Sequence, residues 1–384
     1  MKEIKNNVYY CGITDSGRKY FDELIPLEHG TGYNSYFIKG SRKNALIDTT
    51  YTPKTEKFIE NLGGVRIDYI IANHGEQDHT GAIPALLEKY PSALVLTNPK
   101  CKANIMEMLS VPEDRIRIVA DGEEVLLGDK TLKFIYAPGV HWPDTMFTYL
   151  QEDNLLFTCD FLGAHQAFNA KLDLESAKRY YAEIMMPFAP MCRKYIKLVR
   201  EIAPSVILPS HGPMYTNPEI ILNAYEDWTA AEGKNLVLMP YISMYGSTKE
   251  MVDYTAEKLE KNGVKTLIYD VLNGDLGEFA VGLVDATTII LASPMVLAGP
   301  HPIIIGPAYL LSVLRPKMKF LSFIGSYGWG GDLFTRLGAF LSNLHYCEPC
   351  EPVLAKGKPK PQDFAKLDDL VNAISEKHRE LGLV

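Results

Sequence analysis

Four side chains that can bind a metal occur within six positions of one another: His74, Glu76, Asp78 and His79. They follow an apolar run that ends at Ala72 and predicts a buried strand. Loops at strand ends are where rigid scaffolds place binding and catalytic residues. The segment therefore predicts a metal site.

Three further candidates end strand-like runs elsewhere in the chain: His141, Asp160 and His211. A single histidine in such a place is more often structural, but the recurrence of this context indicates a shared metal centre. Four histidines and three carboxylates are too many for one ion and suit two ions that share a carboxylate. Mixed imidazole and carboxylate ligation favours iron, manganese or zinc over copper(I) or an iron–sulfur cluster. Seven ligands for two ions also leave positions open for a small molecule.

A second motif, at residues 243–248, follows another apolar strand pattern and offers the hydroxyls of Ser243, Ser247 and Thr248. Gly246 lets the backbone bend close to an anion, and the amides of the next helix would complete a phosphate cradle. The motif has no lysine and lacks the spacing of a nucleoside triphosphate loop. Taken alone, such a turn is usually only a helix cap.

Two more loops favour a ligand site. Residues 293–299 and 325–331 follow the third and fourth strand patterns of the same region, where the carboxyl ends of parallel strands bind ligands. Tyr327 and Trp329 offer planar faces, and the neighbouring glycines allow backbone amides to approach a flat ring. The three loops together indicate a nucleotide or flavin site, and its combination with a metal centre indicates redox chemistry.

Length and composition restrict the class of protein. The chain has 384 residues, enough for two domains, and 22% of them are charged, as in a globular protein. A net charge of −8 argues against nucleic acid, and no apolar run is long enough to span a membrane. The start of the chain lacks an apolar signal core, so we expect a cytoplasmic protein. The six scattered cysteines do not suggest disulfides, and Cys347 and Cys350 are interpreted as packed thiols.

The first half of the chain predicts two sheets with helices outside, because strand pairs and helices are mixed rather than strictly alternating. Helical patterns cover residues 53–61, 81–89 and 100–109, and a longer region, 174–202, is broken near Pro187 and Pro190. Strand patterns cover residues 7–11, 35–38, 44–48, 66–72, 93–97, 133–137, 145–150, 154–159 and 206–209.

After Gly233 the pattern becomes a regular alternation. Strand patterns at 235–240, 265–271, 288–292, 319–324 and 352–355 are each followed by a helical one, at 249–261, 276–284, 303–314, 333–344 and 363–381. Five such units in about 150 residues predict a doubly wound parallel sheet. We place the domain boundary within residues 230–234.

The order of the candidate ligands resembles the metallo-β-lactamase-like domain of flavodiiron proteins. That superfamily's two-zinc hydrolases have the pattern HxHxDH, whereas Glu76 here replaces the middle histidine, as in the flavodiiron branch. The three later loops resemble the phosphate loop and the two ring-binding loops of flavodoxin. The resemblance implies an N-terminal αββα metallo-β-lactamase-like sandwich (1–232) that holds two irons, followed by a doubly wound, flavodoxin-like domain (233–384) that binds flavin mononucleotide (FMN).

The resemblance also implies roles for single residues. His74, Glu76 and His141 would hold one iron, Asp78, His79 and His211 the other, and Asp160 would bridge them. Beyond these ligands it implies no catalytic side chain. Independently of the resemblance, Trp142 is expected to shield the pocket and Asp144 to orient His141 or His211; the alternative is a capped turn with an ordinary core tryptophan. The implied FMN contacts are Ser243, Met244, Tyr245, Gly246, Ser247, Thr248, Pro294, Met295, Val296, Leu297, Ala298, Gly299, Ser326, Tyr327, Gly328, Trp329, Gly330 and Gly331.

By this resemblance the chain is an oxidoreductase that reduces dioxygen to water, nitric oxide to nitrous oxide, or both. Electrons would pass from an external donor, of the rubredoxin or reduced deazaflavin type, through FMN to the diiron centre. The family also implies a head-to-tail homodimer, or a dimer of such dimers, without nucleic acid or membrane partners. Two alternatives remain open: a two-zinc hydrolase with a regulatory flavodoxin-like domain, and a flavin-based redox sensor or electron carrier whose metal site is structural.

Overall fold

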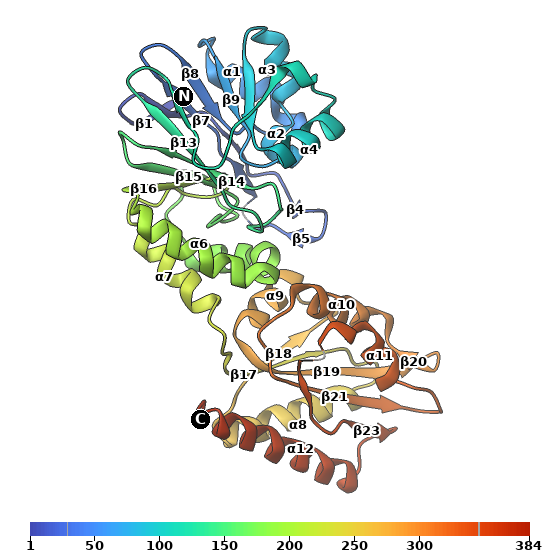
Figure 1. Ribbon diagram of the computed structural model, residues 1–384. Helices are drawn as coiled ribbons and strands as arrows, with labels where there is room; N and C mark the ends of the chain where they lie inside the picture. The colour runs from blue at the N-terminus through green and yellow to red at the C-terminus, as the bar shows by residue number, and fades with distance from the viewer. Residues whose placement is uncertain (29, 345) are drawn as a thin grey trace. The chain divides into compact units, whose positions relative to one another are not determined.

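The computed structural model describes residues 1–28, 30–344 and 346–384, which form two compact units (Figure 1). The first unit covers Met1–Thr229 and the second Ala230–Val384. The division falls after Thr229, three residues before the boundary placed at 232. Each unit has its own hydrophobic core and is described separately.

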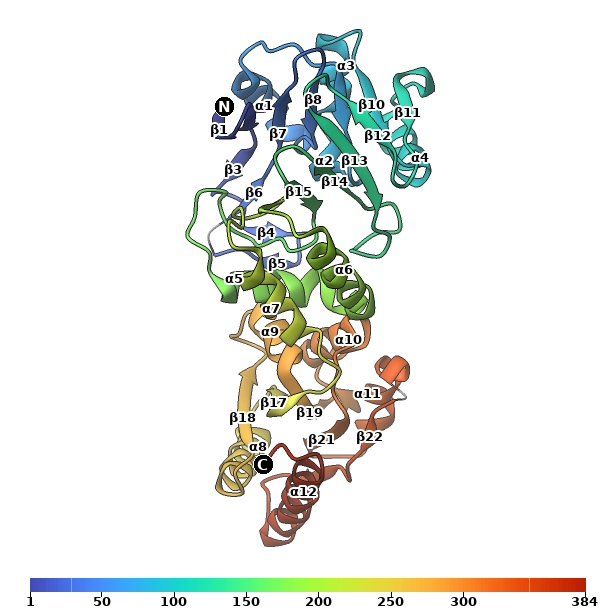
Figure 2. The same cartoon turned by 60° about the vertical axis from the view of Figure 1, so that its left-hand side comes forward.

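The first unit is built on two sheets (Figure 2). In the larger sheet, strands run in the order β1 (Lys2–Lys5), β2 (Val8–Tyr10), β7 (Tyr36–Lys39), β8 (Asn44–Ile47), β9 (Tyr69–Ile71), β10 (Leu94–Thr97) and β11 (Ile116–Ile118). In the smaller sheet the order is β12 (Glu124–Leu126), β13 (Thr131–Tyr136), β14 (Met146–Leu150), β15 (Leu155–Cys159) and β16 (Val206–Pro209). Two short pairs, β3 (Ile13–Asp15) with β6 (Thr31–Tyr33) and β4 (Tyr20–Phe21) with β5 (Ile25–Pro26), lie outside both sheets.

Alternating side chains along the strands create two cores in this unit. On β8, Ala45 and Ile47 face the smaller sheet, where they join Phe134 and Phe157. Leu46 points the other way, into a core with Phe58 and other residues of the helices on that face. These helices are α1 (Thr55–Leu62), α3 (Ile83–Lys89) and α4 (Pro99–Leu109).

Further helices cover the outer face of the smaller sheet. Tyr195 of α6 (Ala189–Ile202) packs against Phe147 of β14. Tyr225 of α7 (Pro218–Trp228) packs against Phe161, which follows β15. The helix α5 (Leu174–Tyr180) precedes α6, and π-helical and 3-10 turns at 181–188 separate the two. The layers are therefore helix, sheet, sheet and helix, which confirms the predicted αββα sandwich.

The second unit has one parallel sheet, in the order β18 (Lys265–Asp270), β17 (Lys234–Tyr241), β19 (Ala286–Val296), β21 (Phe320–Tyr327) and β22 (Glu348–Pro349). Strand β23 (Val353–Lys356) continues beside β21 after β22, and β20 (Gly299–Pro300) pairs with the end of β19. Numbered along the unit, the order is 2-1-3-4-5, as in flavodoxin-like folds.

Helices lie on both faces of this sheet (Figure 1). Apolar residues of α8 (Ser247–Lys261) and α12 (Pro361–Glu380) form the core on one face. On the other side are α9 (Leu276–Asp285), α10 (Ile305–Leu314) and α11 (Phe334–Phe340). The predicted doubly wound parallel sheet is therefore confirmed. Across the described residues, no helix combines the length and the apolar run that crossing a bilayer requires.

Candidate functional site

Loops that follow strands of both sheets carry the seven predicted metal ligands. His74 and Glu76 lie between β9 and the short helix α2 (Gln77–Thr80), which contributes Asp78 and His79. Glu76 is the N-cap residue of that helix. The smaller sheet supplies the remaining three, His141 after β13, Asp160 directly after β15 and His211 after β16. The structure brings all seven side chains together.

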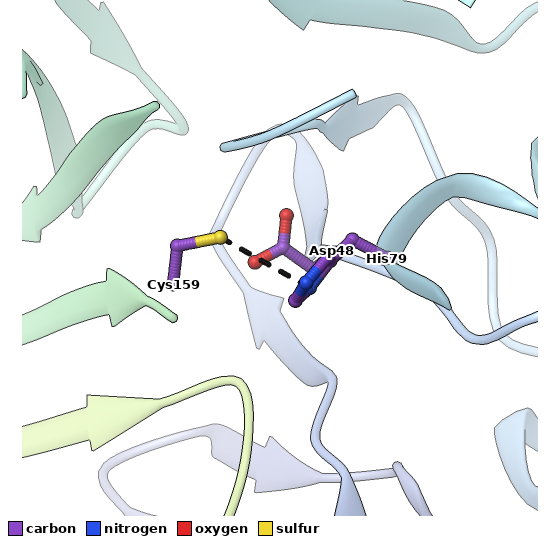
Figure 3. A group of neighbouring side chains, drawn as sticks. All are labelled: Asp48, His79 and Cys159. Atoms are coloured by element: carbon purple, nitrogen blue, oxygen red, sulfur yellow. Dashed lines mark hydrogen bonds between the residues drawn. The ribbon is translucent and has the colours of Figure 1, made fainter. Parts of the chain in front are cut away.

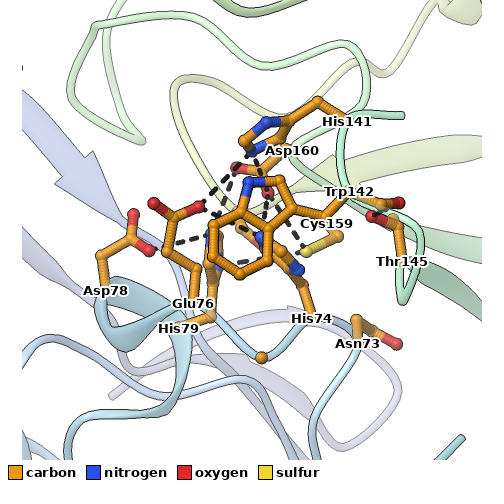
Figure 4. A network of polar contacts seen from close by, with 12 residues as sticks. Asn73, His74, Glu76, Asp78, His79, His141, Trp142, Thr145, Cys159 and Asp160 are labelled. Atoms are coloured by element: carbon orange, nitrogen blue, oxygen red, sulfur yellow. Dashed lines mark hydrogen bonds and ion pairs between the residues drawn. The ribbon is translucent and has the colours of Figure 1, made fainter. Parts of the chain in front are cut away.

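Asp160 divides this cluster into two half-sites, because its two carboxylate oxygens face different histidines (Figure 4). Its Oδ1 lies 3.1 Å from His79 Nε2 and 3.2 Å from His211 Nε2. Its Oδ2 lies 3.7 Å from His141 Nε2 and 3.9 Å from His74 Nε2. One carboxylate therefore reaches both groups of imidazoles, as a bridging ligand must.

A second carboxylate accompanies each half-site. Glu76 Oε2 lies 3.1 Å from His74 Nε2 and 3.5 Å from His141 Nε2. In the other half-site, the two oxygens of Asp78 lie 3.3 Å from His79 Nε2 and 3.2 Å from His211 Nε2. Each half-site thus presents two imidazole nitrogens and one carboxylate beside the shared Asp160.

Several of these atoms are buried without a hydrogen-bond partner among the described residues. They include Asp78 Oδ1, His79 Nε2 and His211 Nε2, which are close to acceptors or donors but lack hydrogen-bond geometry. Buried polar atoms are rarely left unsatisfied, because each one costs about 1–3 kcal/mol. Hard and borderline donors that converge in this way fit two divalent ions such as iron.

Without metal, the cluster has strongly shifted protonation equilibria. Burial alone would lower the pKa of His79, but Asp160 and Asp78 raise it to about 10. Burial would also lower the pKa of His211, but Asp160 and Asp78 raise it to about 10. For Asp160, burial is outweighed by His79 and His211, which hold its pKa well below the usual range. The histidines and carboxylates thus stabilise one another's charged forms, and an ion that binds at these atoms would compete with protons.

Two of the histidines are oriented by strong acceptors on their other ring nitrogen. His74 Nδ1 lies 2.9 Å from Asp144 Oδ1, whose partner oxygen accepts from Gly75 N and from Asn104 Nδ2, each at 2.9 Å. The expectation that Asp144 orients His141 or His211 is therefore wrong, because the loop directs this carboxylate toward His74. His211 Nδ1 lies 2.7 Å from the carbonyl oxygen of Gly32.

Aromatic residues complete the surroundings of the cluster. The Trp142 ring meets His74 edge to face, with centroids 4.8 Å apart. On the other side, Phe21 of the β4–β5 hairpin lies 6.1 Å from the ring of His211. Tyr180 donates its hydroxyl to Asp160 Oδ1 at 2.9 Å. Phe21 and Tyr180 were not predicted from the sequence, since neither lies in a motif with the ligands.

In the second unit, the three predicted loops lie at the carboxyl ends of β17, β19 and β21. Thr248 and Ser326, from the first and third loops, are hydrogen-bonded through their hydroxyls at 2.9 Å. The third loop also packs on the second, because a Cβ at Gly331 would lie 2.2 Å from Met295 Cε. The second segment is more regular than expected. Strand β19 continues to Val296 and forms a tight hairpin with β20.

These loops have the features of a cradle for a flat anionic ligand. Gly246 caps α8 with a φ of +90°, and no described atom lies within 4 Å of the position of a Cβ there. The side chains of Tyr245 and Trp329 are 92% and 68% exposed, which is unusual for such large aromatic rings. The amides at the start of α8 favour a phosphate, and the exposed rings favour stacking on a planar group.

Comparison with known proteins agrees with this geometry. Residues 32–212, which include all seven candidate ligands, match the family model described as "ODP family beta lactamase". The chain is 33% identical to a nitric oxide reductase of Moorella thermoacetica, over 85% of this chain and 86% of the relative. It is 31% identical to the flavo-diiron protein FprA2 of Clostridium acetobutylicum, over 86% and 88% of the two chains.

Other matches differ in their named activity. A coenzyme F420H2 oxidase of Methanothermobacter marburgensis is 32% identical over 91% of this chain and 92% of the relative. Among solved structures, the rubredoxin:oxygen oxidoreductase of Desulfovibrio gigas superposes with a TM-score of 0.93 at 25% identity, covering 99% of this chain and 98% of that one. Each of these matches covers both units of the chain, in the same order, within one known protein.

Proposed function

The chain belongs to the flavodiiron protein family, and on that premise we propose that it is an FMN-dependent oxidoreductase that reduces dioxygen to water, nitric oxide to nitrous oxide, or both. The observation that carries the proposal is the division of Asp160 between two half-sites, in a chain that also has flavodoxin-type loops. The names of the relatives support both gases, since one is a nitric oxide reductase and another an oxygen oxidoreductase.

When bound, FMN would accept electrons from an external donor, and the two irons would deliver them to the gas. His74, Glu76 and His141 would hold one ion, and Asp78, His79 and His211 the other. Asp160 would be the shared ligand. Glu76 supports iron over the zinc of the hydrolases, because a hard oxygen ligand suits an ion that changes its oxidation state.

The surrounding residues keep this ligand set in place. Asp144 fixes the His74 ring and the Gly32 carbonyl fixes that of His211, so that each Nε2 keeps its lone pair toward the cluster. The Tyr180 hydroxyl holds Asp160 by one oxygen. Trp142 and Phe21 place apolar surface beside the histidine rings, which suits a small, weakly polar gas and disfavours a charged substrate.

In the second unit, Ser243, Ser247 and Thr248, with the first amides of α8, would bind the FMN phosphate. Tyr245, Trp329 and the hairpin residues Pro294–Gly299 would enclose the ring, together with Ser326–Gly331. We further propose that the donor is a rubredoxin or a reduced deazaflavin, that the active unit is a head-to-tail homodimer, and that the protein is cytoplasmic.

The decisive experiment has two parts. The iron, zinc and flavin content of the purified protein is measured first, and the oxidation of the reduced protein is then followed by stopped-flow spectroscopy. We expect two irons and one FMN per chain, and rapid reoxidation by dioxygen or nitric oxide. Two zinc ions with hydrolytic activity would instead identify the two-zinc hydrolase. A reduced protein that neither gas reoxidises faster than free flavin would identify a sensor or an electron carrier.

A further inference from the structure

The second histidine of the motif, His79, is held differently from His74 and His211, which have strong acceptors on their other ring nitrogen. Its ring is 2% exposed, and its Nε2 faces Asp160 and Asp78. At its other ring nitrogen, Nδ1, the contact that the described structure provides is Cys159 Sγ, at 4.0 Å (Figure 3). A thiol is a weak donor and a weak acceptor, and this distance is at the outer limit for sulfur.

A carboxylate also lies near His79, but its hydrogen bonds go elsewhere. Asp48 Oδ1 accepts from Asn73 N at 2.8 Å, and its Oδ2 accepts from Asn73 Nδ2 at 3.1 Å and from Ser210 Oγ at 3.0 Å. Ligand atoms of Asp48, His79 and Cys159 lie within 4.8 Å of one another. These three hydrogen bonds direct Asp48 toward Asn73 and Ser210, and the described structure gives no hydrogen bond between Asp48 and His79.

The backbone of Cys159 directs its thiol toward His79. The residue has a φ of +53°, in the left-handed region that non-glycine residues rarely adopt. The pairing of β15 with β16 is irregular between Phe157 and Cys159, where the strand ends. Because of this geometry, the Cys159 thiol lies beside two ligands of the cluster: its Sγ is 4.0 Å from His79 Nδ1 and donates to Asp160 Oδ2 at 3.7 Å. The carbonyl of Cys159 accepts from Ser210 N at 2.8 Å, which keeps the turn fixed independently of the thiol.

We propose that Cys159 is a positioning residue of the cluster, which keeps both the ring of His79 and the shared carboxylate of Asp160 in place. This inference rests on the proposed diiron function. Its physical basis is packing: the buried thiol fills the space beside Nδ1 and limits rotation of the ring. Without it the ring gains freedom, and an ion bound through His79 loses part of its preorganised ligand set.

The test uses metal-free full-length protein titrated anaerobically with ferrous iron. We expect Cys159→Ala to raise at least one of the two dissociation constants by about tenfold. The matched control is Cys192→Ala. Cys192 is equally buried, in α6, and its thiol contacts the carbonyl of Met185, away from the ligands. This control is expected to change neither constant. Cys159→Ser, which keeps a polar group near the ring, is expected to recover part of the lost affinity.

A second readout follows the ring itself. In the cobalt(II)-loaded protein, each coordinated histidine with a ring N–H gives a hyperfine-shifted, exchangeable proton signal. We expect Cys159→Ala to shift one of these signals or to speed its exchange with solvent, and Cys192→Ala to leave all of them in place. A Cys159→Ala protein with two unchanged constants and unchanged signals would overturn the proposal. If this variant does not fold, the same comparison with Cys159→Ser decides.

Failure of the proposed function would look different. A wild-type protein that binds fewer than two irons per chain would overturn the diiron assignment itself. Two tightly bound irons in both wild type and Cys159→Ala would overturn only the role of the thiol.

Discussion

Asp144 Oδ1 lies 2.9 Å from His74 Nδ1, and both side chains are almost completely buried. Burial opposes ionisation of Asp144, but its bond to His74 and the donors Asn104 and Gly75 N hold its pKa below the usual value. The carboxylate is therefore charged, accepts from the ring and fixes its tautomer. Ligating histidines usually need such a partner, and its loss commonly costs 10–100-fold in metal affinity.

We accordingly predict that Asp144→Ala lowers the affinity for one iron by about 10–100-fold and leaves FMN content unchanged. Iron retained after dialysis against a graded series of chelator concentrations measures the effect. Asp129→Ala is the control, because this exposed carboxylate accepts from Ser41 N far from any ligand. Full iron retention and normal turnover in Asp144→Ala would contradict the role given to this residue.

Asp160→Asn should have a broader effect. Its two oxygens face different half-sites, so neutralising the side chain removes the one negative charge that both half-sites share. We expect the loss of both irons under dialysis that leaves wild type loaded, with FMN content as the internal reference. Loss of flavin with full retention of iron would count against the assignment.

Gly246→Ala tests the phosphate loop by conformational strain. A left-handed φ costs a residue with a Cβ about 1–2 kcal/mol, which corresponds to a roughly tenfold loss of FMN affinity if the bound loop requires it. Fluorescence titration of the flavin-free protein measures this. Gly63→Ala is the matched control, since Gly63 has a φ of +63° and equally open surroundings at the end of α1. Equal FMN affinity in the two variants would argue against the cradle.

Complementation tests transfer between chains. A chain disabled at iron by His74→Ala and one disabled at flavin by Gly246→Asp are refolded together, and the heterodimer is isolated by two different tags. If flavin of one chain serves irons of the other, the heterodimer recovers part of the gas reductase activity that each parent lacks. Near-zero activity in a confirmed heterodimer would exclude the head-to-tail arrangement.

His378 gives the second unit a pH-dependent stability. Burial lowers the pKa of this histidine from 6.5 to about 4, and the neutral ring is bonded to Thr288 Oγ1 at 2.8 Å and to Asn235 Oδ1 at 3.0 Å. The unfolded chain binds a proton below pH 6.5, so this contribution is complete above that pH and is lost as the pH falls toward 4. The protection factors of the α12 amides, which are corrected for the pH dependence of chemical exchange, should therefore fall over this range more in wild type than in His378→Gln. Parallel pH dependences would refute the assignment.

The sequence predicted well which side chains would converge, because that information is local. His74, Glu76, Asp78 and His79 share one short segment, and the other three candidates follow recognisable strands. Their partners were harder to predict. Asp144 was identified as a supporting residue but assigned to the wrong ring, since the direction of a loop side chain depends on tertiary packing.

Other features left no sequence signal at all. The acceptor for His211 is the backbone carbonyl of Gly32, which any residue type would provide. Edge strands such as β11 and β12 were missed because they are three residues long and partly exposed, so their apolar alternation is too short to recognise. The long β19–β20 hairpin was expected as an irregular loop, because its Pro and Gly residues suggested a turn.

The division of the ligands between the two sheets has a consequence for the lifetime of the protein. Four of them follow β9 of the larger sheet, and the other three follow strands of the smaller one. Ions bound by both sets would tie the halves of the sandwich together, so that the sheets could not separate without releasing them. Resistance to unfolding would then rise with free iron as RT ln(1 + [L]/Kd). A protein short of iron would unfold more readily and be more open to proteolysis, so that iron supply would affect its lifetime as well as its loading.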